Sequence, residues 1–331
     1  MKRSIALVLL AGLVVSACGG VGLPGFGTGP KVGMVTDIGQ LEDKSFNEFS
    51  WKGVQAGAAA IGGTATAVVT KDTADYAANI QSLIDQDFDV IVTVGFLIGT
   101  DTLKAAQANP EVQFFGVDQF VADPAPANYQ GLLFAENQAG YLAGIVAANI
   151  TKSNKIGAVG GVSAVPPVVA FIEGYRAGAT AEKPNIQVIV NYTESFTEPE
   201  KGDASAKAMI SQGADVIFQV AGLTGAGALR AACSANVWGI GVDVDQWLSL
   251  PDAQKCIVTS AEKKLEIATA DALKRWKDSG KQTGNFFNDA KNDGIGISPI
   301  RNTDLPAGVQ AKLDKALADM KAGTLNPPST K

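Results

Sequence analysis

The feature that most constrains the fold is a unit that recurs along the chain: an apolar strand that ends in a polar or glycine-rich turn and is followed by a helix. In the first half, FDVIVTV (Phe88 to Val94) ends at Gly95 and precedes a predicted helix from Thr100 to Ala108. In the second half, GADVIFQVAG repeats FDVIVTVG, and WGIGVDVDQ repeats FFGVDQF. Strands that alternate with helices at this spacing indicate parallel βαβ units. The repetition predicts an α/β protein with two similar, doubly wound parallel-sheet lobes.

The amino terminus has the pattern of a lipoprotein signal peptide. Two basic residues precede an apolar run from Ile5 to Val15, which is too short for an ordinary membrane span. The run ends in VSAC, which resembles a lipobox, so Cys18 would carry the lipid and begin the mature chain. Residues 18–30 are rich in glycine and predict a flexible tether. A plain secretory signal with an incidental cysteine is the alternative.

The composition excludes several classes of function. The sequence contains no histidine, which removes Ser-His-Asp and Cys-His catalysis and most transition-metal sites. Without the two basic residues of residues 1–17, 25 (27 minus 2) basic residues face 33 acidic residues, a formal charge of −8. An acidic chain without a basic block repels a phosphate backbone, so we expect no nucleic-acid partner. No nucleophile with a base is apparent, and we expect neither enzyme activity nor a cofactor.

The turn after the first predicted strand, Val32 to Val35, collects side chains that suit a small polar ring. Its polar and aromatic residues, and those of the helix that follows, are Asp37, Asp43, Ser45, Phe46, Asn47 and Trp51. In an α/β sheet this turn lies at the carboxyl end of the strand, where ligands bind. Asp43-Lys44-Ser45 also supplies side chains that can cap the following helix. A surface loop with Phe46 packed into the core is the alternative.

Two cysteines remain after Cys18. Cys233 and Cys256 are candidates for a disulfide in an oxidising compartment. Two buried free thiols are the alternative, because the Cα separation that decides the matter does not follow from sequence.

The segment VTDIGQLEDKSFNEFSWKG resembles the signature near the start of the basic membrane protein family of bacterial substrate-binding lipoproteins, whose characterised members bind purine nucleosides. Further segments resemble the family in the same order, to about residue 300, among them VGFLIGTDTLKAAQANPEVQFFGVDQF, IGAVGGVSAVPPVVAFIEGYRAG and GADVIFQVAGLTGAGALRAA. The resemblance implies the type I periplasmic-binding-protein fold. It also implies a lipid-anchored carrier on the extracytoplasmic face of the cell membrane that delivers its ligand to the permease of an ABC importer.

The resemblance further implies a nucleoside held between the lobes. Asp37 and Asp118 would accept hydrogen bonds from N–H groups of the base, with Asn47 beside them. Phe46 from one lobe and Phe196 from the other would stack on the ring.

The sugar would have its own partners. Asp243 would bind ribose hydroxyls, Lys263 would donate to a ribose oxygen, and backbone N–H groups around Gly222 would complete the sugar site. The competing interpretation is that Asp118 and Asp243 only cap the helices after their strands, and that Lys263 only pairs with Glu266.

The second stacking ring, the ligand and the partner each have a rival assignment. Tyr192 could present the second ring in place of Phe196. A sugar or another small polar metabolite would use the same fold with different loops, and a lipoprotein sensor or adhesin would contact a protein. Asn288-Asp289 and Asn292-Asp293 faintly resemble a calcium loop, but Lys291 interrupts the ligand alternation, so we expect a turn and no metal. We expect a monomer.

The fold requires three crossovers between the lobes. We place them near residues 133–137, 257–260 and 284–294. The first lobe then comprises residues 31–135 and 259–285, the second comprises 136–258 and 286–325, and 326–331 form a tail.

Overall fold

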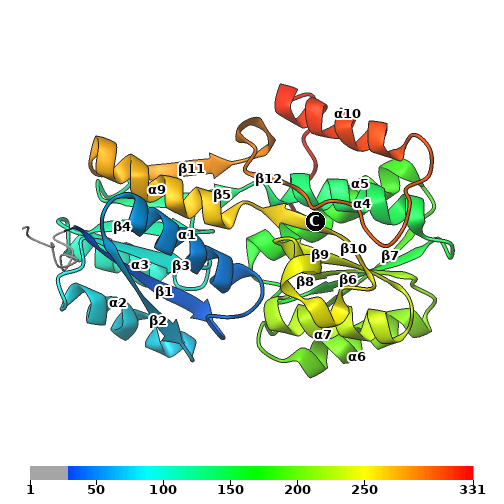
Figure 1. Cartoon of the computed structure of the whole chain (residues 1–331), viewed down its shortest axis with the longest axis horizontal. Helices are drawn as coiled ribbons and strands as arrows, with labels where there is room; N and C mark the ends of the chain where they lie inside the picture. Colours follow the sequence, from blue (N-terminus) through cyan, green and yellow to red (C-terminus); the bar gives the residue numbers. More distant parts are fainter. Residues whose placement is uncertain (1–28, 331) are drawn as a thin grey trace, which may run out of the picture.

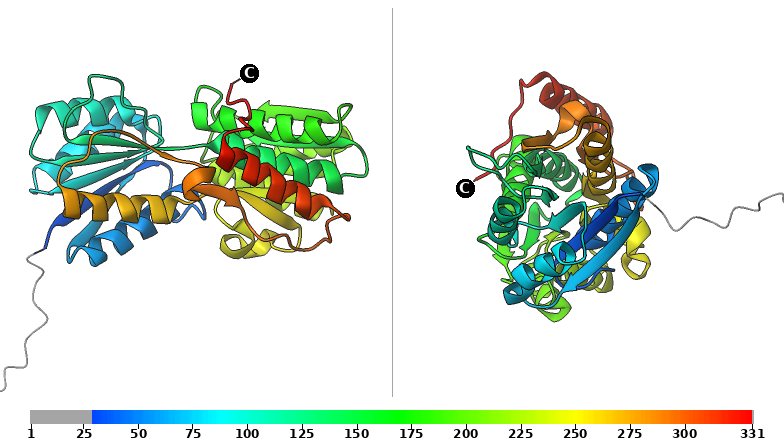
Figure 2. Two further views of the ribbon diagram at one scale, coloured as in Figure 1. Left: turned by 90° about the horizontal axis from the view of Figure 1, so that it is seen from above. Right: turned by 90° about the vertical axis from the view of Figure 1, so that its left-hand side faces the viewer.

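The computed structural model describes residues 29–330. The predicted signal peptide, Cys18 and most of the predicted tether lie outside the described residues. Two sheets of six strands each build two lobes, which lie next to each other along the long axis of the molecule (Figure 1, Figure 2).

The first lobe, on the left in Figure 1, holds the amino-terminal elements and a later return of the chain. Its strands are β1 (Lys31–Ile38), β2 (Thr64–Thr70), β3 (Val90–Val94), β4 (Gln113–Val117), β5 (Tyr129–Phe134) and β11 (Gly284–Asn288). Its helices are α1 (Phe46–Ala60), the short η1 (Thr73–Asp75), α2 (Tyr76–Ile84), α3 (Gly99–Ala108) and α9 (Leu265–Ser279).

The second lobe holds the rest of the described chain. Its strands are β6 (Lys155–Gly160), β7 (Gln187–Tyr192), β8 (Val216–Val220), β9 (Trp238–Asp243), β10 (Ile257–Lys263) and β12 (Ile295–Ile297). Its helices are α4 (Glu136–Ile150), α5 (Pro166–Glu182), α6 (Pro199–Ser211), α7 (Gly222–Ser234), α8 (Gln246–Ser249), η2 (Pro251–Ala253) and α10 (Val309–Ala322), and η3 (Ala290–Asn292) precedes β12.

The two sheets share one strand order, β2-β1-β3-β4-β5 in the first lobe and β7-β6-β8-β9-β10 in the second. Each sheet adds one edge strand: β11 runs parallel to β5, and β12 runs antiparallel to β10. Strands β3, β4 and β8 are buried at every residue, as parallel strands covered on both faces should be. This is the flavodoxin-like doubly wound order, in which ligands bind at the carboxyl ends of the strands. The predicted fold is confirmed.

The chain crosses between the lobes three times. The first crossing, at Ala135 between β5 and α4, and the third, in 289–294 between β11 and β12, fall inside the expected ranges. The second falls later than the expected 257–260, because β10 pairs with β9 as far as Glu262 and with β12 at Lys263. The expected lobe boundaries need the same correction: 259–263 belong to the second sheet, and 286–288 belong to the first.

Two local predictions differ from the structure. The sequence pattern predicts a helix from Ser50 to Ile61, but α1 begins at Phe46. The earlier start follows from Asp43, whose carboxylate accepts hydrogen bonds from the backbone N–H of Asn47 (2.9 Å) and of Glu48 (3.1 Å). Helix α6 was not predicted. It is mostly polar and depends on close packing: a Cβ at Gly202 would lie 1.8 Å from a backbone oxygen of α7.

Glycines also set the distance between α4 and α5. A Cβ at Gly140 would lie 2.1 Å from the backbone oxygen of Phe171, and one at Gly174 would lie 2.1 Å from that of Asn137. The two helices can therefore approach with their backbones in contact. This packing fixes the position of Phe171, which faces the interlobe cavity described below.

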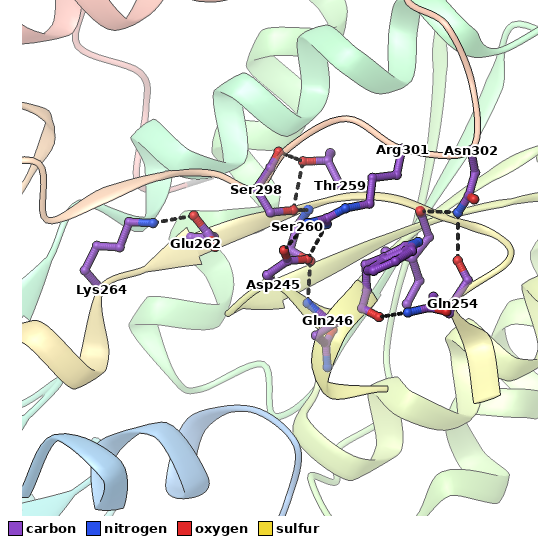
Figure 3. A network of polar contacts seen from close by, with 12 residues as sticks. Asp245, Gln246, Gln254, Thr259, Ser260, Glu262, Lys264, Ser298, Arg301 and Asn302 are labelled. Atoms are coloured by element: carbon purple, nitrogen blue, oxygen red, sulfur yellow. Dashed lines mark hydrogen bonds and ion pairs between the residues drawn. The ribbon is translucent and has the colours of Figure 1, made fainter. Parts of the chain in front are cut away.

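A polar network ties the segment after β9 to the rest of the second lobe (Figure 3). Arg301 pairs through both terminal nitrogens with the carboxylate of Asp245, each at 2.7 Å. The backbone N–H of Gln246 donates to the hydroxyl of Ser260 (3.0 Å), and the hydroxyl of Ser298 accepts from the backbone N–H of Ser260 (2.8 Å). A bidentate arginine–carboxylate pair is directional, so the network holds the turn that follows Asp243 in one place.

The structure contains a disulfide between Cys233 on α7 and Cys256 before β10, with a Cα–Cα distance of 5.2 Å. The sequence left this pairing and two free thiols as open alternatives, and the structure has the pairing. The bond links the two ends of the segment that includes α8.

Candidate ligand-binding cavity between the lobes

A cavity lies between the lobes and is lined from both sides. It encloses about 660 Å³ of space outside the protein atoms, including its opening to solvent. All eight predicted binding residues line it: Asp37, Phe46, Asn47, Asp118, Phe196, Gly222, Asp243 and Lys263. The first four come from the first lobe and the last four from the second, so the cavity is complete only when the lobes face each other.

Asp37 lies at the carboxyl end of β1, and three groups contact it. Its carboxylate oxygen Oδ1 accepts from the hydroxyl of Tyr76 (2.5 Å) and from the backbone N–H of Ile38 (2.7 Å). Its own backbone N–H donates to the side chain of Asn47 (3.0 Å). Burial raises the pKa of Asp37 to about 6, and the negative charge of Asp118 contributes to the rise. The hydrogen bonds from Tyr76 and Ile38 lower the pKa and oppose it.

Asp43 and Ser45 have different roles: Asp43 caps α1, and Ser45 contacts the other lobe. Asp43 caps α1, as predicted, and burial raises the pKa of its carboxyl to about 7 against three lowering backbone hydrogen bonds. Ser45 makes no side-chain cap. Its hydroxyl donates to the carboxylate of Asp243 (2.9 Å), in the opposite lobe.

Asp118 and Lys263 form a second contact between the lobes. The ammonium of Lys263, the last residue of β10, lies 2.5 Å from Oδ2 of Asp118 and 3.2 Å from the carboxylate of Glu136, the first residue of α4. All three side chains are less than a tenth exposed. Burial alone would lower the pKa of Lys263, but the surrounding carboxylates of Asp118, Glu136 and Asp243 raise it above its ordinary value. The lysine is therefore a buried, permanently charged cation.

Asp118 also carries an oxygen with no partner. Its second carboxylate oxygen, Oδ1, is buried and receives no hydrogen bond from residues 29–330. A buried acceptor without a donor is costly, by about 1–3 kcal/mol or more for a charged group. The oxygen belongs to a residue that lines the cavity, so a ligand with an N–H or O–H group can supply the missing hydrogen bond.

Asp118 and Asp243 occupy equivalent places in the two lobes. Asp118 directly follows β4, and Asp243 ends β9, the corresponding strand of the second sheet. Both have left-handed backbones, with φ of 61° and 64°, which non-glycine residues adopt rarely and which concentrate at functional sites. Burial raises the pKa of Asp243, while the charge of Lys263 and the hydrogen bond from Ser45 lower it.

Apolar groups form the walls between these carboxylates. Phe46 comes from the start of α1, and Phe196 comes from the loop after β7. Phe196 lines the cavity and the neighbouring Tyr192 does not. The start of α5 adds a wall that the sequence did not predict, with Val165, Pro167, Val168 and Phe171. The ammonium of Lys263 lies 5.0 Å from the ring centre of Phe46 and 5.6 Å from that of Phe171, within the range of cation–π attraction.

Two glycines, Gly222 and Gly95, belong to the lining of the cavity. Gly222 begins α7 with φ of 55°, and Gly222 and Leu223 line the cavity, so backbone N–H groups of the first turn lie at its wall. The first four N–H groups of a helix have no partner inside the helix. Gly95, after β3, lies against Asp37: a Cβ there would be 2.2 Å from the carboxylate oxygen Oδ2.

The sequence missed two polar partners of the predicted site. Tyr76 and Glu136 do not line the cavity but bind residues that do. Tyr76 follows the polar segment KDTAD and Glu136 stands at a crossover, so neither carried a ligand-binding pattern. Lys263 does not pair with Glu266, the expectation that competed with ligand binding; its partners are Asp118 and Glu136.

Metal binding finds no support in the described part of the chain. Residues 29–330 contain no group of three or more cysteine, aspartate and glutamate side chains that could hold a metal ion. The segment that resembled a calcium loop is a 3-10 turn in which Asp289 and Asn292 form a capping box. Within the same residues, no helix is long and apolar enough to cross a membrane.

Two doubly wound lobes around a cavity that both of them line define the type I periplasmic-binding-protein fold. The family described as "ABC transporter substrate-binding protein PnrA-like" matches residues 30–326, and the chain belongs to this family, Bmp. Its members are carriers that serve ABC transporters and not enzymes, and the family is extracytoplasmic.

Curated relatives agree with this assignment. The "CD4+ T-cell-stimulating antigen" of Listeria innocua is 32% identical over 99% of both chains. The "ABC transporter nucleoside-binding protein BmpA" of Lactococcus lactis is 31% identical, over 90% of this chain and 89% of its own. "Basic membrane protein A" of Borreliella burgdorferi is 31% identical, over 98% of this chain and 94% of its own.

Solved structures agree in fold. A solute-binding protein of an ABC transporter system from Aeropyrum pernix superposes with a TM-score of 0.79 at 23% identity, covering 90% of this chain and 94% of that chain. A protein of the same description from Conexibacter woesei superposes with a TM-score of 0.71 at 25% identity, covering 91% and 99%.

Proposed function

We propose that this protein captures a nucleoside, with a purine base, in the interlobe cavity and delivers it to the permease of an ABC importer. The observation that carries the proposal is the composition of the cavity. Carboxylates that accept hydrogen bonds come from both lobes, and so do the phenylalanines Phe46 and Phe196. A nucleobase has a flat apolar face and an edge of N–H donors, and a ribose has hydroxyl donors.

The buried Oδ1 of Asp118 favours a ligand that carries a hydrogen-bond donor. A ligand N–H group beside it would remove the desolvation cost of the unpaired oxygen, which no apolar ligand could do. Asp37, with Asn47 beside it, would accept from the same base. On the sugar side, Asp243, Lys263 and the N–H groups around Gly222 would bind the ribose.

Delivery would follow from closure of the lobes. Cavity residues come from both lobes, so a ligand contacts all of them only in the closed arrangement and stabilises it. We further propose that the protein acts as a monomer on the outer face of the cell membrane, held by a lipid on Cys18. The name of the Lactococcus lactis relative, a nucleoside-binding protein, supports the ligand class.

The test is a thermal-shift screen of the body from Gly29 onward, unfolded and refolded to remove bound ligand. Adenosine, guanosine, inosine, free purine bases, ribose, hexoses and amino acids are added singly. A ligand at 100 times its dissociation constant adds about 2.7 kcal/mol to the free energy of unfolding, enough for a clear rise in melting temperature.

Two variants make the test specific. Phe196→Ala removes one stacking face and should abolish most of the nucleoside-dependent rise. Phe287→Ala is the matched control, because Phe287 is 58% exposed on edge strand β11 and does not line the cavity. A rise with a hexose and none with any nucleoside would refute the nucleoside and favour a sugar as the ligand.

A further inference from the structure

Tyr76 donates a hydrogen bond to Asp37, and none of the proposed ligand contacts explains why it does. Tyr76 begins α2, is 2% exposed and does not line the cavity. Its hydroxyl lies 2.5 Å from Oδ1 of Asp37. The same oxygen accepts the backbone N–H of Ile38, so Oδ1 has two protein donors.

The other carboxylate oxygen is left for the cavity. Within residues 29–330, Oδ2 of Asp37 accepts no hydrogen bond, and it packs against Gly95, where a Cβ would lie 2.2 Å away. The terminal torsion of an aspartate is broad, so without a donor on Oδ1 the carboxylate could rotate. The two donors on Oδ1, the hydroxyl of Tyr76 and the backbone N–H of Ile38, keep Oδ2 in one orientation, and Gly95 leaves room for it.

We propose that Tyr76 is a positioning residue for ligand binding: its hydroxyl keeps the carboxylate of Asp37 ionised and directs Oδ2 toward the ligand. The ligand role of Asp37 rests on the function proposed above. The effect of Tyr76 on the carboxylate does not, because it acts in the ligand-free protein.

The surroundings of Asp37 make such a donor necessary. The negative charge of Asp118, which follows β4, disfavours the ionised form of Asp37. The negative charge of Asp101, in the first turn of α3, raises the pKa of the Tyr76 hydroxyl and so favours its protonated form. Asn47, the side chain from α1, is neutral and accepts from the backbone of Asp37 rather than donating to its carboxylate. Lys263, a cation at the cavity, is bound to Asp118 and Glu136.

Loss of the hydroxyl should therefore move the titration of Asp37 upward. The folded-state pKa of Asp37 already lies above its ordinary value, and the bond from Tyr76 opposes that rise. In Tyr76→Phe we expect the pKa to increase by about one unit or more, since a hydrogen bond to a charged group favours the ionised form by about ten-fold or more. A protonated Asp37 offers an O–H where a base N–H needs an acceptor.

The primary measurement is the ¹³C carboxyl titration of Asp37 by NMR in ligand-free protein, wild type and Tyr76→Phe, with Asp37→Asn to assign the signal. Tyr129→Phe is the matched control. Tyr129 is equally buried in the same lobe and donates over the same distance, 2.5 Å, but to the neutral side chain of Gln119. Circular dichroism melts show that each variant is folded.

The second measurement is the pH profile of inosine and adenosine affinity by calorimetry between pH 5 and 9. If only the ionised form of Asp37 binds, we expect Tyr76→Phe to bind about ten-fold more weakly near pH 5, about two-fold more weakly near pH 7 and like the wild type at pH 9, while Tyr129→Phe follows the wild type throughout. An unchanged pKa of Asp37 in Tyr76→Phe would overturn the inference. If the pKa moves as expected but the wild type binds no nucleoside, the inference about Tyr76 stands and the proposed function fails.

Discussion

Replacing Lys263 by methionine tests the electrostatics of the cavity most directly. Methionine keeps much of the apolar stem but removes the ammonium, which lies 2.5 Å from Asp118 and 3.2 Å from Glu136. The three side chains are 2–8% exposed, so solvent cannot replace the lost charge. Removing one partner of a buried ion pair costs about 3–5 kcal/mol, because the remaining charge is buried and unpaired. We expect the free energy of unfolding at pH 8 to fall by that amount.

The loss should depend on pH. Burial and the charge of Asp118 raise the pKa of Glu136, and the charge of Lys263 lowers it. In Lys263→Met the carboxyl of Glu136 holds its proton more readily, so the loss should shrink as the pH falls toward 5 and a proton neutralises this carboxyl. Denaturant unfolding followed by circular dichroism and by tryptophan fluorescence measures the loss and checks that both lobes unfold together.

A neighbouring lysine supplies the control. Lys264 pairs with Glu262 but is 35% exposed, so Lys264→Met should cost less than about 1 kcal/mol at either pH. A loss below about 1 kcal/mol for Lys263→Met at pH 8, or a loss equal at pH 8 and pH 5, would refute the view that Lys263 compensates two buried carboxylates.

Three further predictions follow from the cavity and the disulfide. The pKa values of Asp37 and Asp43 are raised to about 6 and about 7, so the folded state binds protons more tightly than the unfolded state. The free energy of unfolding of the ligand-free protein should therefore rise by about 2 kcal/mol or more from pH 8 to pH 5. Equal denaturation midpoints at the two pH values would contradict this prediction. Adenosine monophosphate should bind at least about ten-fold more weakly than adenosine in calorimetry, because carboxylates outnumber the single cation Lys263 among the residues that line the cavity; comparable affinities would contradict it. Replacing Cys233 and Cys256 by serine should cost about 3 kcal/mol, given the 23-residue separation that the disulfide closes, whereas an unchanged denaturation midpoint would mean that the bond does not constrain the unfolded chain.

The parts of the fold that sequence predicts well are those governed by local repetition. Strands β3 and β4 end at Val94 and Val117, where a glycine and an aspartate follow. In the second sheet, β8 ends two residues before Gly222, and β9 ends at Asp243 itself. Parallel strands place all these ends at one edge of a sheet, so the approximate site follows from the strands alone. Helix α6 escaped prediction because its stability comes from backbone contact with α7 at Gly202, not from an apolar stripe.

The parts that sequence did not predict depend on partners that are distant in the chain. Lys263 and Asp118 are 145 residues apart, and their pairing requires the second crossover to come after β10 rather than within it. Tyr76 and Asp37 are separated by a strand and a helix. No local pattern reports such contacts, because burial and charge compensation are properties of the packed lobes. Residue type and position indicate the candidate residues, whereas their protein partners follow only from the structure.

The two equivalent aspartates connect the internal repeat to closure. Asp118 in the first lobe receives the ammonium of Lys263 from the second, and Asp243 in the second lobe receives the hydroxyl of Ser45 from the first. Each lobe thus contacts the other through an aspartate at the end of an equivalent strand, β4 in the first lobe and β9 in the second. Because each aspartate also lines the cavity, a ligand that contacts them acts on the residues that already join the lobes. Under the proposed function, binding and closure would share the same side chains, which is the coupling that a carrier with two lobes requires.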